Sequence, residues 1–501
     1  MKKFLSVLLC LSLTLTLLGG VFTAAGAEEP VKLTIFIDHT WYPVETFSGI
    51  IPEAITAATG VVLEPIVAVD SNQLGVMIAS GELPDLVYTQ TMVDRMSDPE
   101  VSLCYEDLIA QYNIGWQLSD KQLGIAKGYA TDGRAYTVLN HYSEKKDWEG
   151  ITGAAPMLGS LLYRGDLLKA VGSPEIKSFD DLYSVFGLIK AAYPDVTPLK
   201  LNNVWNTLVF RYLNGMGQLD FIEQADGTYL HYTEDPRYLE MLMWLNECYR
   251  AGYIIPDDPY FVKGSTAIAD DKYFASCACT QNSLPGANAT LAAINPGYYC
   301  QELVPFEASS YLTSDLGWSG TFITKNCKNP EAAIKLVAWM FTPEAQKLTQ
   351  MGREGIEYTM NEAGLPQFSK EWKDAIAAGE QNNKYNVWFY LGGSEIVEAI
   401  SRCATTDQAL VSEAYRIMVD RFDNLPWVMA ALPVGESDEK IILDKIKTLV
   451  TTYEAKVILA ASQEEAKATF QEYMDNARKT GLDTLDAYMT TRIAEVMPLY
   501  K

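Results

Sequence analysis

Histidine is scarce in this chain, which has three among 501 residues: His39, His141 and His231. That supply is poor for a hydrolytic triad or a histidine-rich metal site. The chain also lacks the glycine-rich phosphate-binding motifs, the zinc-protease motif HExxH and the nucleophile motif GxSxG. Acidic pairs such as Asp180 and Asp181 are common, but in so acidic a chain we expect them to be solvated or to cap helices rather than to form a glycosidase pair.

Positive charge is also in short supply. The chain has 39 Lys and Arg against 64 Asp and Glu, for a formal net charge of −25. This acidity argues against nucleic acid or an anionic membrane as a partner. It favours neutral or cationic ligands without identifying one.

Long apolar runs are absent after the N-terminus. Lys2 and Lys3 precede an apolar run from Phe4 to Leu18, and Ala25-Gly26-Ala27 fits a small-x-small cleavage site. No later run reaches the roughly 18 apolar residues that a membrane span needs. We therefore predict a secretion signal over residues 1–27 and a soluble, exported mature chain, with an uncleaved anchor as the alternative. The mature chain is long enough for two or more domains.

Cysteines are scattered, with no CxxC pair. Cys10 lies in the predicted signal, which leaves seven, so at least one thiol must be free. Cys277 and Cys279 form a lone CxC that suits a zinc site poorly. The count is compatible with buried free cysteines or with one or two disulfides.

Strand and helix patterns alternate from the start of the mature chain. We predict strands at 31–37, 61–69 and 85–88, with helices at 51–59 and 73–79 between them. This order is typical of an α/β fold with a mainly parallel sheet. Ligands of such sheets lie beyond the carboxyl ends of the strands, here the loop after Ile37 and residues 89–91.

Helix-start signals are clear further along the chain. Asn329-Pro330-Glu331 and Thr342-Pro343-Glu344 each offer a cap residue, a proline and an acid in the first turn. Residues 270–315, by contrast, are rich in turn formers and predict only short strands. The other predicted elements are strands at 135–139, 161–163 and 321–324 and helices at 107–113, 119–129, 166–171, 204–213, 237–249, 437–461, 463–479 and 482–497, with a further helix behind Ser178 and others from about residue 393.

Aromatic and amide side chains gather in the predicted loops. Aromatic faces suit the C–H faces of a carbohydrate, and amides and carboxylates hydrogen-bond its hydroxyls. Each tryptophan could instead belong to the core, but we expect at least two to line a cleft. The candidates on this argument alone are Trp205, Trp318, Tyr385 and Trp388.

Several segments resemble the extracellular solute-binding proteins of carbohydrate ABC importers, family 1 type, above all its large oligosaccharide-binding members. Ala79–Leu86 (ASGELPDL) is similar to the family's ASGxLPD turn and strand, and Asp132–Tyr136 (DGRAY) to its DGKxY turn. Leu162–Leu168 resembles the entry to the second lobe. Lys328–Ala333 and Gly352–Tyr358 (GREGIEY) match best, and the order of the motifs is shared over most of the chain.

The resemblance implies an α/β, two-lobed periplasmic-binding-protein fold, type II-like, with hinge crossovers and a helical C-terminal region. The implied N-terminal lobe is 28–142 with 318–358, and the C-terminal lobe is 143–317 with 359–501. An oligosaccharide would bind in the cleft, and hinge closure would present the closed form to the permease subunits. We expect a monomer that is not an enzyme and carries no cofactor; the alternatives are a binding protein for a non-sugar solute and a secreted glycosidase or lyase.

The family also suggests where the ligand binds. Its contacts follow the first strand, the LPD strand and the first crossover, and one lies in the GxEGxxY turn. The corresponding residues of this chain are Asp38, His39, Trp41, Thr89, Gln90, Asn140, His141 and Tyr358.

Two departures from the family pattern matter. Ala27 and Glu28 stand where many relatives carry a lipobox cysteine, which argues against a lipid anchor and leaves a periplasmic or a secreted protein open. Ala192–Leu199 keeps the end of a segment that follows a calcium-like loop in some relatives, but the oxygen ligands are missing. We therefore expect no metal site.

Overall fold

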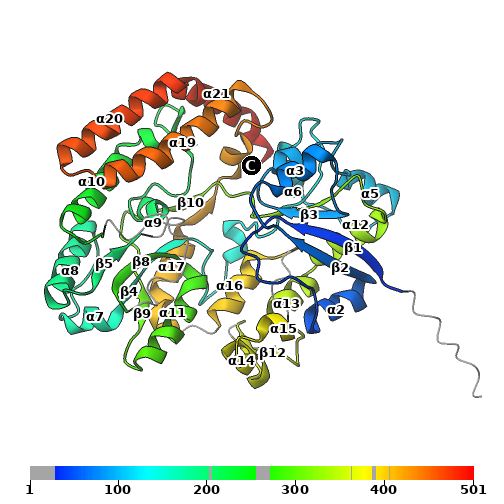
Figure 1. Cartoon of the computed structure of the whole chain (residues 1–501), viewed down its shortest axis with the longest axis horizontal. Helices are drawn as coiled ribbons and strands as arrows, with labels where there is room; N and C mark the ends of the chain where they lie inside the picture. The colour runs from blue at the N-terminus through cyan, green and yellow to red at the C-terminus, as the bar shows by residue number, and fades with distance from the viewer. Residues whose placement is uncertain are drawn as a thin grey trace, which may run out of the picture.

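The computed structural model describes residues 29–201, 206–255, 271–362, 364–385, 391–404 and 407–500. Two open sheets, each flanked by helices, lie side by side (Figure 1). We call the sheet near the N-terminus with its helices the first lobe and the other the second lobe. The predicted α/β, two-lobed architecture is confirmed.

The sheet of the first lobe has the order β11-β3-β1-β2. β1 pairs in parallel with β2 and β3, and β11 is antiparallel to β3. Gly60 and Gly81, both in the left-handed region, end the two helices that return the chain between strands. The elements are β1 (Val31–Ile37), α2 (Ile50–Thr59), β2 (Val61–Val67), α3 (Gln73–Ser80), β3 (Leu86–Thr89) and β11 (Gly320–Ile323).

The sheet of the second lobe has the order β5-β8-β4-β9. Alternate residues of β4 enter two cores: Leu161 packs with the cluster of α8, α9 and α10, and Leu162 with that of α11, α16 and α17. The elements are β4 (Gly159–Arg164), α7 (Gly165–Ala170), α8 (Phe179–Ala192), β5 (Thr197–Lys200), α9 (Asn206–Leu213), α10 (Pro236–Arg250), β8 (Tyr273–Cys279), α11 (Thr280–Ile294), β9 (Cys300–Glu302), α16 (Glu395–Cys403) and α17 (Ser412–Arg421).

Local capping chemistry sets the helix starts that the sequence predicted. The side chain of Asn329 accepts a hydrogen bond from Ala332 N at 3.1 Å, at the start of α12 (Pro330–Met340). Thr342 does the same from Ala345 N at 3.2 Å for α13 (Pro343–Met351). Other short elements are α4 (Val93–Met96), α5 (Tyr105–Gln111), α6 (Asp120–Gly128), β6 (Phe221–Glu223), β7 (Tyr229–His231), β10 (Tyr311–Thr313), β12 (Tyr358–Met360), β13 (Pro366–Phe368), α14 (Lys370–Ala377), α15 (Gln381–Lys384), β14 (Phe422–Asn424) and α18 (Pro426–Ala430).

Two predicted stretches differ in the structure. Residues 135–139 form no strand. Leu139 makes a single bridge to Gly320, and the hydroxyl of Thr137, rather than a backbone N–H, donates to the carbonyl of Thr321. Residues 270–315 hold the seven-residue β8 and the fifteen-residue α11 rather than short strands alone. α11 contains Pro285, a residue that disfavours a helix interior, so its sequence reads as a turn.

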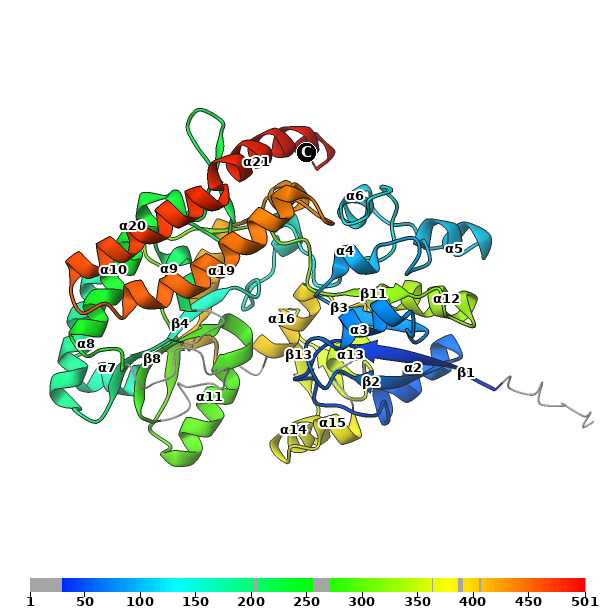
Figure 2. The ribbon, with the colours of Figure 1, turned by 45° about the horizontal axis from the view of Figure 1, so that its top comes forward.

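The C-terminal region is helical, as predicted. α19 (Asp438–Ile458), α20 (Gln463–Thr480) and α21 (Leu482–Val496) follow one another, and α19 packs against α10. These helices run along one side of the second lobe, and α21 extends toward α6 of the first (Figure 2). Leu485, Met489 and Ile493 of α21 share an apolar cluster with Phe36 and Val87 of the first sheet. The C-terminal helices therefore contact both lobes.

Three crossing segments meet between the lobes. Asn140 N donates to Ser319 O at 2.9 Å, Trp318 N donates to Asn140 O at 2.8 Å, and His141 N donates to Gly393 O at 2.9 Å. Gly393 is required here because a Cβ would lie 2.3 Å from His141 Cε1. Beyond it, α16 packs against α11 of the second lobe and α13 of the first.

The structure describes six cysteine side chains, most of them buried. This agrees with the buried-cysteine alternative, and none of the six forms a disulfide with another. They are Cys104, Cys248, Cys277, Cys300, Cys327 and Cys403.

Candidate ligand-binding site

Three aromatic rings gather where β1 ends and the crossing segments begin. His39 lies 5.1 Å from Trp318 with planes 6° apart, and 5.1 Å from Trp41 with planes 27° apart, measured between ring centroids. The two indoles are 5.9 Å apart. His39 is buried, Trp318 is partly buried and Trp41 is 47% exposed. We call these three residues the aromatic cluster; its accessible rings are those of Trp41 and Trp318.

Asp38 holds the loop that carries the cluster. Its backbone N–H donates to Tyr88 O at 2.9 Å, which continues the pairing of β1 with β3. Its Oδ2 accepts hydrogen bonds from the hydroxyls of Thr89 at 2.8 Å and Thr91 at 2.6 Å. Asp38 and Thr89 are buried, so their role in this arrangement is to fix the loop beneath the rings.

His39 is neutral at physiological pH. Burial lowers the pKa of its imidazole to about 4, although the Asp38 carboxylate opposes the change. Its Nε2 lies 3.3 Å from the hydroxyl of Ser319 on the second crossing segment. The cluster is therefore tied to a crossing segment without carrying a positive charge on the imidazole.

Asn140 joins two crossing segments to the first sheet. Its amide donates to the hydroxyl of Tyr88 at 2.8 Å and its Oδ1 accepts from Ser319 N at 2.9 Å. The residue is 1% exposed. Its amide is thus directed at protein groups and positions the second crossing.

His141 links the cluster to α16. Its ring lies edge-on to Trp318, with centroids 5.6 Å apart, and its Nε2 is 2.6 Å from an oxygen of Glu398. Arg402 pairs with the other oxygen of Glu398 at 2.6 Å. Burial alone would raise the pKa of Glu398, but Arg402 and His141 outweigh it and hold the value at about 2.

Gln90 is exposed and faces a different space from the aromatic cluster. It lines a cavity of about 360 Å³ between α4 and α6 of the first lobe and α18 and α19, together with Asp94, Tyr129 and Lys447. None of the three rings lines this cavity. Gln90 is thus the one predicted residue found at this second opening among those the structure describes.

Tyr358 and Tyr385 are not brought to the aromatic cluster. Both are buried in the first-lobe core, where the ring of Tyr385 lies 4.4 Å from that of Trp372. The hydroxyl of Tyr358 is 3.5 Å from Glu354. This placement favours a core role for both tyrosines over contact with a ligand.

Trp205 and Trp388 lie outside the described residues. Sequence reasoning did not find Ser319, Glu398 or Arg402. Ser319 and Glu398 have partners far away in the chain, and Arg402 is linked to His141 only through Glu398. Ser319 alone had a local signal, as the neighbour of a loop tryptophan.

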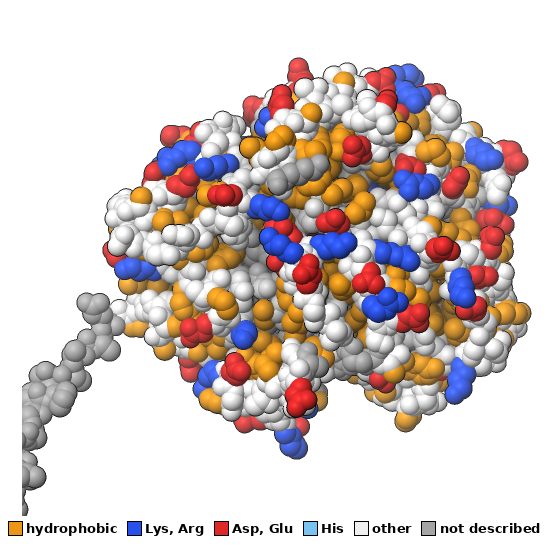
Figure 3. Space-filling model, turned by 180° about the vertical axis from the view of Figure 1, so that it is seen from behind, with side chains coloured by type: hydrophobic (Ala, Val, Ile, Leu, Met, Phe, Trp, Pro, Cys, Tyr) orange, Lys and Arg blue, Asp and Glu red, His pale blue; other side chains and the backbone are white. Residues whose placement is uncertain are grey.

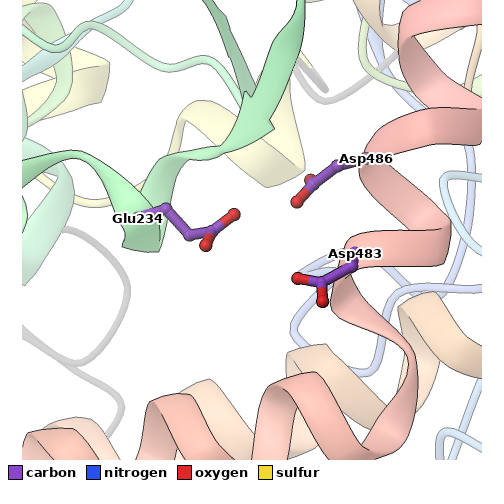
Figure 4. A group of neighbouring side chains, drawn as sticks. All are labelled: Glu234, Asp483 and Asp486. Atoms are coloured by element: carbon purple, nitrogen blue, oxygen red, sulfur yellow. The ribbon is translucent and has the colours of Figure 1, made fainter.

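Three carboxylates lie close together away from the aromatic cluster. Asp483 and Asp486 of α21 point toward Glu234, which ends a short 3₁₀ helix (Figure 4). Burial, and then the neighbouring Glu234, raise the pKa of Asp486 to about 8, and Arg478 lies 3.3 Å from Glu234. A proton on Asp486 and the positive charge of Arg478 reduce the repulsion among the three carboxylates. This explains how they can lie so close together. The expectation of no metal site stays a prediction.

No helix in the described ranges is both long enough and apolar enough to cross a membrane. No curated protein sequence matches the chain.

Solved structures of similar fold cover nearly the whole chain. One is the alginate-binding protein AlgQ2 without calcium ion, 17% identical with a TM-score of 0.68, matched over 93% of this chain and 98% of that one. Another is an HMO-binding, ABC-transporter-associated solute-binding protein from Bifidobacterium longum infantis, 12% identical with a TM-score of 0.66, over 94% and 99%. A third is the N-glycan transport solute-binding protein NgtS from Streptococcus pneumoniae, 16% identical with a TM-score of 0.61, over 94% and 100%.

At these identities the solved structures establish the fold. The family follows from the sequence match, since residues 52–385 fit the model of the bacterial extracellular solute-binding proteins. The two-lobed fold and the three crossings agree with that match. This chain belongs to the family of bacterial extracellular solute-binding proteins.

Proposed function

We propose that this protein is the substrate-binding component of an ABC importer and binds an oligosaccharide between its lobes. The observation that carries the proposal is the aromatic cluster of His39, Trp41 and Trp318 at the meeting point of the crossing segments. Stacking on such rings contributes about 1 kcal/mol each beyond the burial of area. The names of the similar structures, which mention alginate, HMO and N-glycan, support a carbohydrate ligand.

The ligand acts by favouring the closed state. A glycan that touches both lobes binds that state more tightly and shifts the population toward it. The crossings then serve as the hinge, and the closed form is the one delivered to the permease subunits.

The lobe division is part of this proposal. The first two boundaries expected from the sequence, at 142 and 317, lie beside contacts between crossing segments. The third was expected at 358. Trp372 and Tyr385 pack in the first-lobe core, whereas Ala399 and Cys403 pack in the second, which favours a return near Gly393.

Family membership makes the protein extracellular. We propose that residues 1–27 are removed on export and that the protein acts as a monomer without a lipid anchor, free in the periplasm or outside the cell. The face in Figure 3 fits a monomer, since acidic, basic and apolar side chains are interspersed over it.

A panel of oligosaccharides, peptides and polyamines tests the proposal through melting temperature and calorimetry. We expect a rise in Tm with at least one oligosaccharide, and its recovery chemically unchanged after incubation. A shift with peptides or polyamines alone would identify a non-sugar solute. Cleavage of the glycan would identify the glycosidase or lyase alternative.

A further inference from the structure

His141 bends the first crossing through an uncommon backbone conformation. Its φ is 57°, in the left-handed region, which the Cβ of an ordinary residue disfavours by about tenfold in population. Three other non-glycine residues in the described ranges share this region: Met92, Asn113 and Ser173. These three are exposed and flank helices α4, α5 and α7, where the chain turns. His141 is instead buried and flanks no helix, so its conformation needs another explanation.

Contacts from the third crossing hold His141 in this conformation. Its backbone N–H donates to Gly393 O at 2.9 Å, and its Nε2 lies 2.6 Å from a carboxylate oxygen of Glu398. Arg402 pairs with the other oxygen of that carboxylate at 2.6 Å. A backbone conformation that is unfavourable on its own persists where such contacts outweigh its cost. The pairing with Glu398 therefore stabilises the bend.

The bend separates two anchored parts of the first crossing. Before it, the amide of Asn140 donates to the hydroxyl of Tyr88 in the first sheet at 2.8 Å. After it, the hydroxyl of Ser143 accepts a hydrogen bond from Nε1 of Trp148 at 3.0 Å, and Trp148 packs in the core of the second lobe. His141 thus lies where the chain passes from one lobe to the other. A change in its φ and ψ would turn one lobe relative to the other.

The same imidazole contacts the aromatic cluster. It lies edge-on to the indole of Trp318, with ring centroids 5.6 Å apart and planes at 80°. We propose that His141 and Glu398 are positioning residues of the binding site: Glu398 holds the bend at His141, and the bend fixes both the angle between the lobes and the place of Trp318. This inference rests on the proposed function and adds to it the residues that set the geometry of the site.

Two substitutions of His141 separate the bend from the loss of the imidazole. His141→Ala and His141→Gly both remove the pairing with Glu398, but only alanine keeps the Cβ that opposes the left-handed region. We expect His141→Ala to lose about tenfold in affinity for an oligosaccharide that the unaltered protein binds, and His141→Gly to recover most of that loss. Equal affinities of the two variants, or weaker binding by His141→Gly, would overturn the inference while leaving a carbohydrate-binding protein. Binding of no oligosaccharide by the unaltered protein would instead overturn the proposed function.

Ser173 supplies the matched control, since it shares the left-handed region but is exposed behind α7. Ser173→Ala and Ser173→Gly should differ in denaturant unfolding, because the same cost of a Cβ applies, and they should bind the oligosaccharide equally well. A difference in affinity between the two Ser173 variants as large as that between the two His141 variants would show that stability alone governs binding. That result would overturn the role of the bend.

Small-angle X-ray scattering measures the arrangement of the lobes without any ligand. The radius of gyration of ligand-free His141→Ala should differ from that of the unaltered protein. Glu398→Gln, which keeps the size of the side chain but not its charge, should shift the radius in the same direction, and His141→Gly should scatter as the unaltered protein does. Glu398→Gln decides the question where His141→Ala does not fold, since residue 141 is then unchanged. An unaltered radius in whichever of these two variants folds would overturn the role of the bend.

Discussion

His141 Nε2 lies 2.6 Å from a carboxylate oxygen of Glu398, and both side chains are almost completely buried. The pair joins the first crossing to α16, and Arg402 completes it from the same helix. A buried ion pair of this kind contributes little net stability, but removing one partner leaves the other without its counter-charge.

Glu398→Ala should therefore destabilise the protein by about 3–5 kcal/mol in urea unfolding. The matched control is Glu331→Ala, which removes an equally short pair with Lys335 at 2.6 Å where both side chains are about half exposed. An exposed pair contributes about 0–1 kcal/mol, so this control should unfold nearly as the unaltered chain does. Equal losses in the two variants would contradict the role given to burial.

The pH dependence of the free energy of unfolding should reveal the protonation of the Glu395 carboxyl. Burial raises the pKa of its carboxyl to about 7, so the folded chain holds a proton that the unfolded chain has released above its ordinary pKa of 4.5. The stabilisation is complete below about pH 4.5 and is lost as the pH rises through about 7, with a slope of at most about 1.4 kcal/mol per pH unit.

Glu395→Gln should flatten this part of the pH profile, since the amide cannot titrate. Asp486 and Glu302 also have raised pKa values, both about 8, so the measured quantity is the difference between the two profiles from pH 4.5 to 7.5. A difference independent of pH would show that Glu395 is ionised throughout the range.

Gly393→Ala should destabilise the protein at the contact between the crossing segments of His141 and Gly393. Its added methyl would lie 2.3 Å from the ring of His141, so the ring or the backbone must move, at a cost of about 1–3 kcal/mol. Gly128→Ala at the end of α6 is the matched control, because a Cβ there meets no atom within 4 Å. In denaturant unfolding, Gly393→Ala should lose more free energy of unfolding than Gly128→Ala. A Gly393→Ala variant as stable as the unaltered protein would show that the crossing segments can adjust to the added methyl group.

Much of the fold was predictable because its signals are local. The caps Asn329, Thr342 and Ser178 need only a side-chain oxygen and an N–H three residues on. β1 was predicted with its exact bounds, Val31–Ile37, since a β-prone run ends at a polar loop. α11 was missed because Pro285 lies inside it, and its packing against the second sheet outweighs that local preference.

The site was only partly predictable, because its chemistry comes from long-range contacts. Asp38, His39, Trp41 and Trp318 do lie together, as the loop positions suggested. The pairing of His141 with Glu398 could not be predicted, because the two residues are far apart in the chain and no local sequence pattern links them. Tyr385 was predicted to line the cleft because it follows a polar stretch, and the local sequence does not show that Trp372 packs against it.

Trp41 should contribute to ligand binding more than to stability. It is 47% exposed, so Trp41→Ala loses little buried area, but it removes the most exposed ring of the aromatic cluster, on which a sugar can stack. We expect the affinity for a bound oligosaccharide to fall about fivefold to tenfold, consistent with about 1 kcal/mol of stacking plus lost contact area. Trp339→Ala on α12 is the control, since this partly buried tryptophan lines a separate pocket with Tyr358 and Glu344. Calorimetric titration should find unchanged affinity in the control, and an equal loss in both variants would place the ligand away from the aromatic cluster.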